Sequence, residues 1–350
     1  MFDHISFHVS MESATKALKQ GSYLMMIAEG TPFLELPTKE GITLCGALFP
    51  RVIFKHKVYS SGILLLKLSK DTSLSIIDLS EIHTLLMHEQ SQTILAIVDG
   101  FCVPIDNFLE KFYERLPEAC KLIGAGAGKT NLIQEPVIFD QNRFYMNSAI
   151  VLASSSKIGI GVKHGWKSLK GPLIATQCHD NIIEKINYHD AFEVYKTIIE
   201  SETALRFQKT PFFKISQRHP LGLMRYNKDF LVREPLSTDG KNIFLVGNLE
   251  PNSVLSILTC EPKEIIHAAK EAARLSLDDK NDPSFSSVCI IDCISRFYLL
   301  DQDYPKELKA IASVYPTQTL VWGVLSLGEI ANSNQENIEF YNNTCVVGTL

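Results

Sequence analysis

The sequence predicts an α/β protein built from two mixed α/β halves. Short apolar stretches of strand length alternate with amphipathic stretches of helical length along the 350 residues, which is typical of α/β folds. Residues 93–98 form a continuous apolar run that ends at Asp99, and Ile105, Phe108 and Leu109 then share one face of an expected helix. The composition, 45% hydrophobic and 21% charged, suffices for the cores of two medium-sized domains.

The remaining elements follow the same alternation. A helix is expected after Asp190, which is a suitable N-cap residue, and a second helix near Pro262. Gly165, Gly171 and Pro172 interrupt the pattern and predict a boundary between the halves within residues 165–190. Strands are expected at 121–124, 144–153, 158–162, 243–246, 254–259, 288–291 and 320–325.

Charge and hydropathy exclude several classes of protein. The net charge is −5, and no long basic cluster is present, so we expect no nucleic-acid partner. No apolar run approaches the ~18 residues that span a bilayer, and the N-terminus lacks the pattern of a secretory signal. We therefore expect no membrane association and a cytoplasmic protein, in which the eight cysteines stay reduced.

The sequence contains partial matches to catalytic and nucleotide-binding motifs, and none of them is complete. Residues 124–130, Gly-Ala-Gly-Ala-Gly-Lys-Thr, resemble a phosphate-binding loop, but Ile123 stands where its first glycine belongs. We interpret this stretch as a flexible glycine turn after a strand. No cysteine pair has a metal-ligand spacing, and no complete catalytic motif is present, so a binding module is favoured over an enzyme. The enzyme alternative would use Cys293 as a nucleophile, or the glycine turn at 124–128 for a nucleotide.

Several segments, taken in order, resemble one protein family. The C-terminal half contains Cys289-Ile-Ile-Asp-Cys-Ile-Ser-Arg296, then Gly328-Glu-Ile330, then Asn342-Asn-Thr344 before an apolar end. The N-terminal half contains Leu122-Ile-Gly-Ala-Gly-Ala-Gly128 and His164-Gly-Trp-Lys167. This order resembles the FIST family, with the N-terminal FIST domain at 41–175 and the C-terminal FIST domain at 190–347. Residues 1–40 are short and divergent, which leaves the family's first strand and helix open here.

The resemblance implies a function in ligand sensing. FIST domains sense small molecules inside the cell and are found alone or fused to signalling output domains. We expect this chain to bind a small-molecule or gas ligand and to act through a separate partner, such as a histidine kinase or a cyclic-di-nucleotide enzyme. The predicted function is therefore signal transduction without catalysis.

Five polar residues are the candidate ligand contacts. Ligands of α/β proteins bind at the carboxyl ends of strands, and Asp292 ends an apolar strand, where we expect it at the rim of a pocket. The other four match the resemblance and add charged, amide and hydroxyl groups: Arg296, Glu329, Asn343 and Thr344. The structural alternative is a salt bridge between Asp292 and Arg296, with Asn343 capping a turn.

A branch of the family, the NosP-like nitric-oxide sensors, binds haem through a histidine. Residues 46–58 resemble the start of that branch's N-terminal domain, and His219 lies in a His-Pro-Leu-Gly segment. His219 is the first candidate for the iron ligand, and Arg218 and Arg225 are candidates for the haem propionates. His56 is the second candidate ligand, on the face of an expected strand. The alternative to haem is an amino acid or a similar small metabolite.

Overall fold

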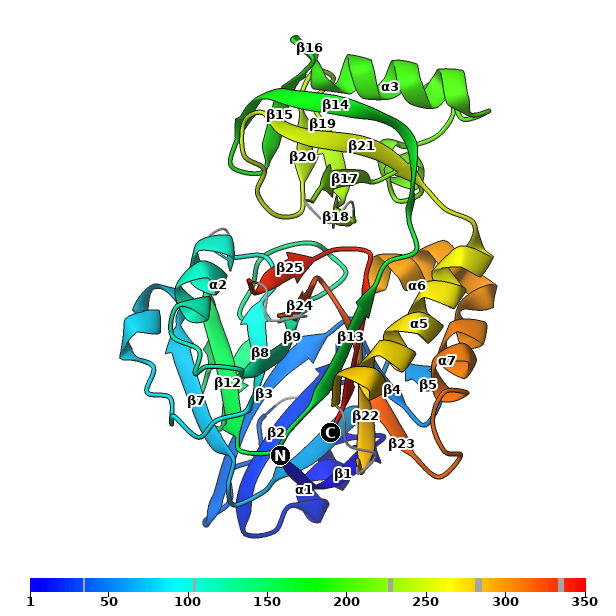
Figure 1. Cartoon of the computed structure of the whole chain (residues 1–350). Helices are drawn as coiled ribbons and strands as arrows, with labels where there is room; N and C mark the ends of the chain where they lie inside the picture. Colours follow the sequence, from blue (N-terminus) through cyan, green and yellow to red (C-terminus); the bar gives the residue numbers. More distant parts are fainter. Residues whose placement is uncertain (34, 103–104, 226–228, 281–284, 333–336) are drawn as a thin grey trace.

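A computed structural model describes residues 1–33, 35–102, 105–225, 229–280, 285–332 and 337–350. The chain forms a body and a lobe (Figure 1). The body contains the residues up to about 166 and those after about 259, and the lobe is formed by the residues between them. The polypeptide passes between body and lobe twice, once before the strand β14 (Lys167–His179) and once after the strand β21 (Ser253–Thr259).

The body consists of three units with the same topology. Each unit has an edge strand, two parallel strands, a hairpin and a closing strand that pairs with the first parallel strand. Unit 1 comprises β1 (Phe2–His8), α1 (Met11–Ala17), β2 (Gly21–Ala28), β3 (Ile42–Phe49), β4 (Arg51–Phe54), β5 (Lys57–Tyr59) and β6 (Ile63–Leu68).

Unit 2 follows directly in the chain. It comprises β7 (Ser73–Asp78), a 3-10 helix η1 (Leu79–Thr84), β8 (Thr93–Asp99), α2 (Ile105–Tyr113), β9 (Lys121–Ala127), β10 (Ile138–Asp140), β11 (Phe144–Tyr145) and β12 (Ser148–Ser154). The helix α2 buries Ile105, Phe108, Leu109 and Phe112, as the sequence pattern predicted.

Unit 3 contains the lobe as an insertion after its edge strand. Before the lobe it has β13 (Gly159–Lys163). After the lobe come α5 (Pro262–Lys280), β22 (Ser287–Cys293), α6 (Ile294–Leu300), η2 (Asp301–Asp303), α7 (Tyr304–Ala312), β23 (Leu320–Ser326), β24 (Glu329–Ala331), β25 (Glu339–Tyr341) and β26 (Cys345–Thr349).

The lobe is built on one eight-stranded sheet with the helix α3 on its outer face (Figure 1). Its elements are β14 (Lys167–His179), β15 (Ile182–Ile186), β16 (His189–Asp190), α3 (Ala191–Glu202), α4 (Phe212–Ser216), β17 (Leu221–Met224), β18 (Phe230–Arg233), β19 (Pro235–Thr238), β20 (Ile243–Leu245) and β21 (Ser253–Thr259). A separate apolar cluster, which includes Tyr195 and Ile257, forms its core.

The three units exchange their hairpins in a cycle. The sheet orders are β1-β6-β2-β3-β10-β11, β7-β12-β8-β9-β24-β25 and β13-β26-β22-β23-β4-β5. The hairpin of unit 1 therefore completes the sheet of unit 3, that of unit 3 completes unit 2, and that of unit 2 completes unit 1. No unit has a complete sheet without a neighbour, so the two halves of the chain share their sheets.

One glycine recurs at the same register position in all three units. Gly46, Gly124 and Gly323 each lie on the second parallel strand, three residues before the last pair with the first strand. A Cβ atom would lie 2.1 Å, 2.5 Å and 1.8 Å, respectively, from the carbonyl oxygen of the paired residue on the first strand. The recurrence supports the equivalence of the units, because only glycine allows this close approach of the backbones.

The α/β class and the mixed character of both halves are confirmed. The expectation of a turn at residues 124–128 is wrong, because residues 121–127 all belong to β9 and Gly128 only follows it. Residues 124–128 are glycines and alanines because the backbones of neighbouring strands approach closely and leave no room for larger side chains. The glycines therefore serve packing and do not make the segment flexible. The segment before Gly41, whose structure the sequence left open, carries β1, α1 and β2.

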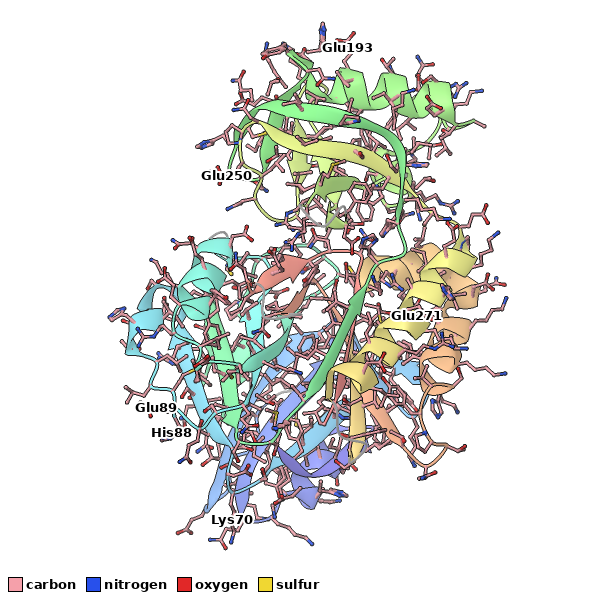
Figure 2. All side chains as sticks on the ribbon, viewed as in Figure 1. Lys70, His88, Glu89, Glu193, Glu250 and Glu271 are labelled. Carbon is pink, nitrogen blue, oxygen red and sulfur yellow. The ribbon has the colours of Figure 1, made fainter. Side chains whose placement is uncertain are left out.

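The outer surface is polar. Charged side chains project outward from the body and from the lobe, among them Lys70, Glu89, Glu193 and Glu271 (Figure 2). No helix of the described residues is both long and apolar enough to cross a membrane.

Candidate functional site

The five predicted ligand contacts converge at the carboxyl end of β22. Asp292, Arg296, Glu329, Asn343 and Thr344 are all buried, with at most 1% of any side chain exposed. They come together because β22 pairs with β26 on one side and with β23 on the other, and the turns after β23 and before β26 therefore meet the start of α6. The sequence identified a real cluster of polar side chains.

Arg296 is the centre of this cluster and is bound on every side. Its Nε lies 2.9 Å from Asp292 Oδ1, and its Nη2 lies 3.0 Å from Glu307 Oε1. Its guanidinium also donates to the carbonyl oxygens of His164 (2.8 Å) and Ile265 (3.1 Å). Burial alone would lower the pKa of Arg296, but the carboxylates of Glu307 and Asp292 raise it. The side chain joins α5, α6, α7 and the end of β13.

The expectation that Asp292 lies at the rim of a pocket is wrong. The residue is 0% exposed, and two groups compensate its charge: Arg296, and the hydroxyl of Tyr304, which donates to Oδ2 at 2.6 Å. A carboxylate is stable in a core when it is paired and hydrogen-bonded in this way. Asp292 and Arg296 form the structural salt bridge that the sequence left as the alternative.

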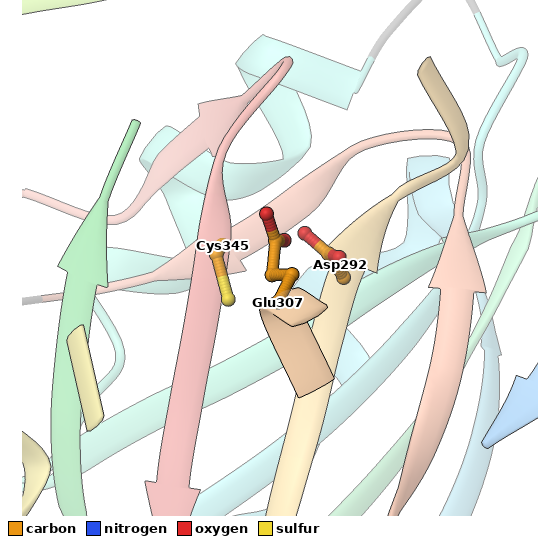
Figure 3. A group of neighbouring side chains, drawn as sticks. All are labelled: Asp292, Glu307 and Cys345. Carbon is orange, nitrogen blue, oxygen red and sulfur yellow. The ribbon is translucent and has the colours of Figure 1, made fainter. Parts of the chain in front are cut away.

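Asp292, Glu307 and Cys345 lie close enough together to suggest a metal site (Figure 3), with one ligand atom from each within 4.8 Å of the others. The Arg296 guanidinium already contacts both carboxylates and supplies the positive charge there. Burial also raises the pKa of the Cys345 thiol well above its ordinary value, whereas metals bind the thiolate. We interpret the group as a buried ion network.

Glu329 holds the two turns beside this network. Its carboxylate accepts hydrogen bonds from the Ser326 hydroxyl (2.6 Å) and from the backbone N–H of Thr344 (3.2 Å). Burial raises the pKa of Glu329 well above its ordinary value. Asn343 differs from the others, because among the described residues neither its side-chain oxygen nor its side-chain nitrogen has a hydrogen-bond partner.

A cavity of about 80 Å³ lies next to this cluster, between the lobe and the body. The lobe contributes Phe213, Glu234, Leu236 and Val246. The body contributes the following residues from the strand ends of units 2 and 3: Phe101, Thr130, Leu132, Cys293, Ile294, Ser295, Tyr298, Leu327 and Asn342. None of the five predicted contacts is among the lining residues, although Asn342 and Cys293 adjoin them in sequence.

Glu234 is the charged residue of this cavity. It is 4% exposed, and its Oε2 accepts a hydrogen bond of 2.6 Å from the Ser295 hydroxyl. No hydrogen bond of normal geometry reaches its buried Oε1 from the described residues, although the Asn343 side chain lies near enough to lower its pKa. Burial raises the pKa of Glu234 to about 7, against the opposing effects of Ser295 and Asn343. A carboxyl group that titrates near neutral pH in a cavity is a typical feature of functional sites.

The four candidate haem residues have different surroundings. His219 is buried, with Nδ1 3.1 Å from the Leu258 carbonyl oxygen, and burial lowers its pKa. Arg225 is ion-paired with Glu339, and Arg218 is exposed. The placement of His56 on a strand face is wrong: it lies in the two-residue turn between β4 and β5, where its positive φ of 65° fits the hairpin.

Cys293, the nucleophile of the enzyme alternative, lines the cavity but is only 4% exposed. Burial raises the pKa of its thiol well above the ordinary value, and the nearby Glu329 and Glu234 add to the effect. A reactive cysteine requires a lowered pKa and access to solvent. The geometry therefore gives no support to nucleophilic catalysis by Cys293.

Two acidic residues at the site were missed, and each had a signal in the sequence. Glu307 lies on the apolar stripe of α7, three residues after Tyr304 and four before Ile311, so its helical position is buried. Glu234 follows the buried strand residues 231–233. An acid on a buried stripe or strand indicates either a structural ion pair or a ligand contact.

Comparison with known protein families gives two matches. Residues 35–189 match the FIST N domain, and residues 191–332 match the FIST C domain. The border between the matches falls in the lobe, between β16 and α3, so the lobe sheet contains strands of both domains. A search of curated proteins gave no match.

Proposed function

The chain belongs to the FIST family, and we propose that it is a sensor whose small ligand binds to Glu234 in the cavity between lobe and body. Domains of this family act as small-ligand sensors in signal transduction. The proposal adds the position of the ligand and its chemical class.

The buried Oε1 of Glu234 is the observation that carries this proposal. A buried acceptor without a hydrogen bond costs about 1–3 kcal/mol, and a ligand that donates an N–H or O–H to it would remove that cost. The other carboxylate oxygen is already held by Ser295 at 2.6 Å, so the carboxyl group is oriented before a ligand arrives. Preorganisation of this kind lowers the entropic cost of binding.

The size and lining of the cavity restrict the ligand. A water-sized position needs roughly 10–15 Å³, so a volume of about 80 Å³ accommodates a molecule of roughly five to eight non-hydrogen atoms. Phe101, Leu132, Phe213 and Leu236 provide an apolar wall opposite the carboxyl group. An amino acid or a similar amine with a short apolar part fits both features.

A ligand in this cavity would couple the lobe to the body. Several polar contacts already join the two parts, among them a hydrogen bond of 2.8 Å from the Arg233 guanidinium to the Phe340 carbonyl oxygen and the ion pair of Arg225 with Glu339. The hydrogen bond from Ser295 to Glu234 is the one beside the cavity that involves the proposed ligand contact. Because the ligand would touch both parts, its binding would favour one relative position of the lobe, which a partner protein can detect.

The test is thermal unfolding of the protein with each of the twenty amino acids, in the wild type and in Glu234→Gln. We expect at least one amino acid to raise the Tm of the wild type by a few degrees at saturating concentration. Glu234→Gln should lose most of this increase, while Glu250→Gln, which changes an exposed glutamate of the lobe, should keep it. An increase that persists in Glu234→Gln would contradict the assignment of the site, and no increase in the wild type would exclude the amino-acid class.

Haem binding at His219 is a second candidate function, supported by one observation. The Leu258 carbonyl oxygen accepts a hydrogen bond from His219 Nδ1–H, and burial lowers the pKa of His219, so both favour the neutral imidazole whose lone pair is on Nε2, the atom that would bind iron. The candidate propionate partners fit less well, because Arg225 is engaged by Glu339. Reconstitution with haem tests this function: we expect a Soret band that shifts with nitric oxide and is lost in His219→Ala. Protein that takes up no stoichiometric haem would exclude it.

The predicted partner is a histidine kinase or a cyclic-di-nucleotide enzyme. This prediction can be tested with an amino acid that binds at Glu234 or with haem bound at His219. The ligand should change the activity of a co-purifying kinase or cyclic-di-nucleotide enzyme. Glu234→Gln should abolish an amino-acid response and leave a haem response intact, so the two candidate functions are distinguishable.

A further inference from the structure

A second cavity, with a volume of about 470 Å³, lies at the end of the body farthest from the lobe, beside β1 and α1 (Figure 1). It is formed entirely by unit 1. The residues that carry its chemistry are His4, Ser6 and His8 of β1, Lys19 after α1, Tyr23 of β2 and Lys67 of β6.

Strand register explains why these side chains gather. His4, Lys67 and Tyr23 are directly paired across the neighbouring strands β1, β6 and β2, so they form one row on the same face of the sheet. Ser6 and Leu65 form the next row on that face. The helix α1 packs against β1 and β6 and closes one side. The cavity is therefore built on a sheet face, which fixes the directions of its side chains.

The cavity concentrates positive charge in a chain whose net charge is −5. Two lysines and two histidines line it, and none of the described lining residues is acidic. The nearest acid of α1, Glu12, is paired with Lys16 at 2.5 Å. No ion pair links Lys19 or Lys67 to any residue in the described part of the chain. The site thus has positive charge without a protein counter-charge.

Hydroxyl groups orient the more buried histidine. His8 Nε2 lies 2.9 Å from Ser6 Oγ, and His8 Nδ1 lies 3.1 Å from Ser13 Oγ. The Tyr23 hydroxyl is held by the backbone N–H of Lys19 at 3.1 Å. These contacts hold the wall of the cavity in place, with the ammonium groups of Lys19 and Lys67, the His4 imidazole and the Tyr23 hydroxyl around one volume.

We propose that this cavity binds a phosphate monoester. A dianionic phosphate has three terminal oxygens for several donors, and lysine ammonium groups are common phosphate ligands. Leu65, Ala17 and the ring of Tyr23 supply apolar surface for the carbon part of the ester. The volume lies within the roughly 300–1,000 Å³ typical of small-molecule sites. The proposal does not depend on ligand binding at Glu234, which is at the other end of the body.

Calorimetric titration of the whole chain with phenyl phosphate and with inorganic phosphate, at low salt, tests the proposal. We expect saturable binding of one phenyl phosphate per chain, weaker binding of inorganic phosphate, and loss of affinity as salt is added. Lys67→Ala should weaken binding by roughly tenfold or more, because it removes a charged hydrogen-bond donor. Lys19→Ala, at an exposed position that does not endanger folding, should weaken it in the same direction.

Lys16→Ala is the matched control, since it removes the same charge from α1 outside the cavity, and it should leave the affinity unchanged. Equal weakening by Lys16→Ala would show non-specific attraction and overturn the proposal. Absence of saturable phenyl phosphate binding would overturn it as well. Vesicles that contain phosphatidic acid distinguish a lipid phosphate from a soluble one: binding to vesicles without binding of phenyl phosphate would replace the proposal by a membrane headgroup site.

Discussion

Units 2 and 3 of the body have the same topology but different interiors at equivalent positions. Val98 in unit 2 and Asp292 in unit 3 both stand one residue before the end of the first parallel strand, and they pair with Ala149 and Cys345 of the closing strands. The interior is apolar in unit 2 and ionic in unit 3, where Arg296 and Glu307 are added. The shared strand order therefore forms without a charged residue at this position. The ion network around Arg296 is a feature of unit 3 that unit 2 does not share.

The asparagines that precede the closing strands extend this comparison. Asn147 and Asn343 occupy equivalent positions and share a left-handed backbone, with φ of 47° and 52°. In unit 2 the Asn147 side chain accepts a hydrogen bond of 2.8 Å from Gln134, whereas the Asn343 side chain is buried and unpartnered. Unit 3 is also where the lobe is inserted and where the cavity with Glu234 lies. The buried side-chain atoms of Asn343 and Glu234 that lack a hydrogen bond to a described residue therefore lie in the unit whose structure differs most from that of the other two.

Removal of Arg296 should have the largest effect. Arg296→Ala leaves Asp292 and Glu307 buried without their counter-charge, and breaking a buried ion pair costs about 3–5 kcal/mol. We expect a loss of this size in the free energy of unfolding, measured with urea. Arg274→Ala, which removes an exposed ion pair with Glu271 on α5, should cost under about 1 kcal/mol. Equal losses for the two variants would show that the network does not stabilise unit 3.

The next effect concerns pH and Glu234. Its pKa of about 7 in the folded protein exceeds its ordinary value of 4.5, so between these values the unfolded chain has lost a proton that the folded chain keeps. Stability should therefore fall as pH rises through this window, by at most about 3 kcal/mol, at about 1.4 kcal/mol per unit. Urea unfolding at pH 5 and pH 8 measures the fall.

Glu234→Gln should flatten this pH dependence, whereas Glu250→Gln should retain it. If the fall between pH 5 and pH 8 is the same in both variants, another group is responsible for it.

The shared glycines test the equivalence of the units directly. Gly124→Ala and Gly323→Ala should each destabilise by about 1–3 kcal/mol, because the new methyl group meets backbone that has little freedom to move. The loss should be greater at Gly323, where a Cβ would lie 1.8 Å from the Ile290 oxygen, than at Gly124, where the distance to the Ala96 oxygen is 2.5 Å. Gly240→Ala, where a Cβ meets nothing within 4 Å but φ is 96°, shows in the same thermal unfolding experiment how much backbone strain costs without a clash. The reverse ranking would contradict the equivalence.

The smallest effect is expected for Glu307→Gln. Glutamine keeps the size of Glu307 and a side-chain oxygen that can accept hydrogen bonds from Arg296, and Asp292 remains as a counter-charge of the guanidinium. We expect a loss of about 1 kcal/mol for Glu307→Gln and a much larger one for Glu307→Ala, which leaves a cavity and removes the hydrogen-bond acceptor of Arg296. Equal losses in urea unfolding would show that the negative charge of Glu307, and not its size or its hydrogen bonds, stabilises unit 3.

Local patterns in the sequence determined the elements and part of the site. The apolar run at 93–98, the helical face at 105–112 and the strands at 288–291 and 320–325 were predictable, because side-chain periodicity follows directly from helix and strand geometry. Asp292 was found because it ends an apolar strand, whereas Arg296, Glu329, Asn343 and Thr344 were found through the resemblance to the FIST family.

Only the tertiary structure decided the exchange of hairpins. The pairing of β4 with β23 joins residues far apart in the sequence, and the hydrophobic periodicity of either strand does not indicate its partner. It also decided that Asp292 is a structural residue, because its charge is compensated by Arg296 of α6 and Tyr304 of α7, which only the tertiary structure brings together. Glu234 became a candidate ligand contact for the same reason. The packing of the lobe against the body buries Glu234 Oε1 without a hydrogen bond and raises the pKa of the carboxyl group. That packing joins residues far apart in the sequence, so local sequence patterns cannot predict it.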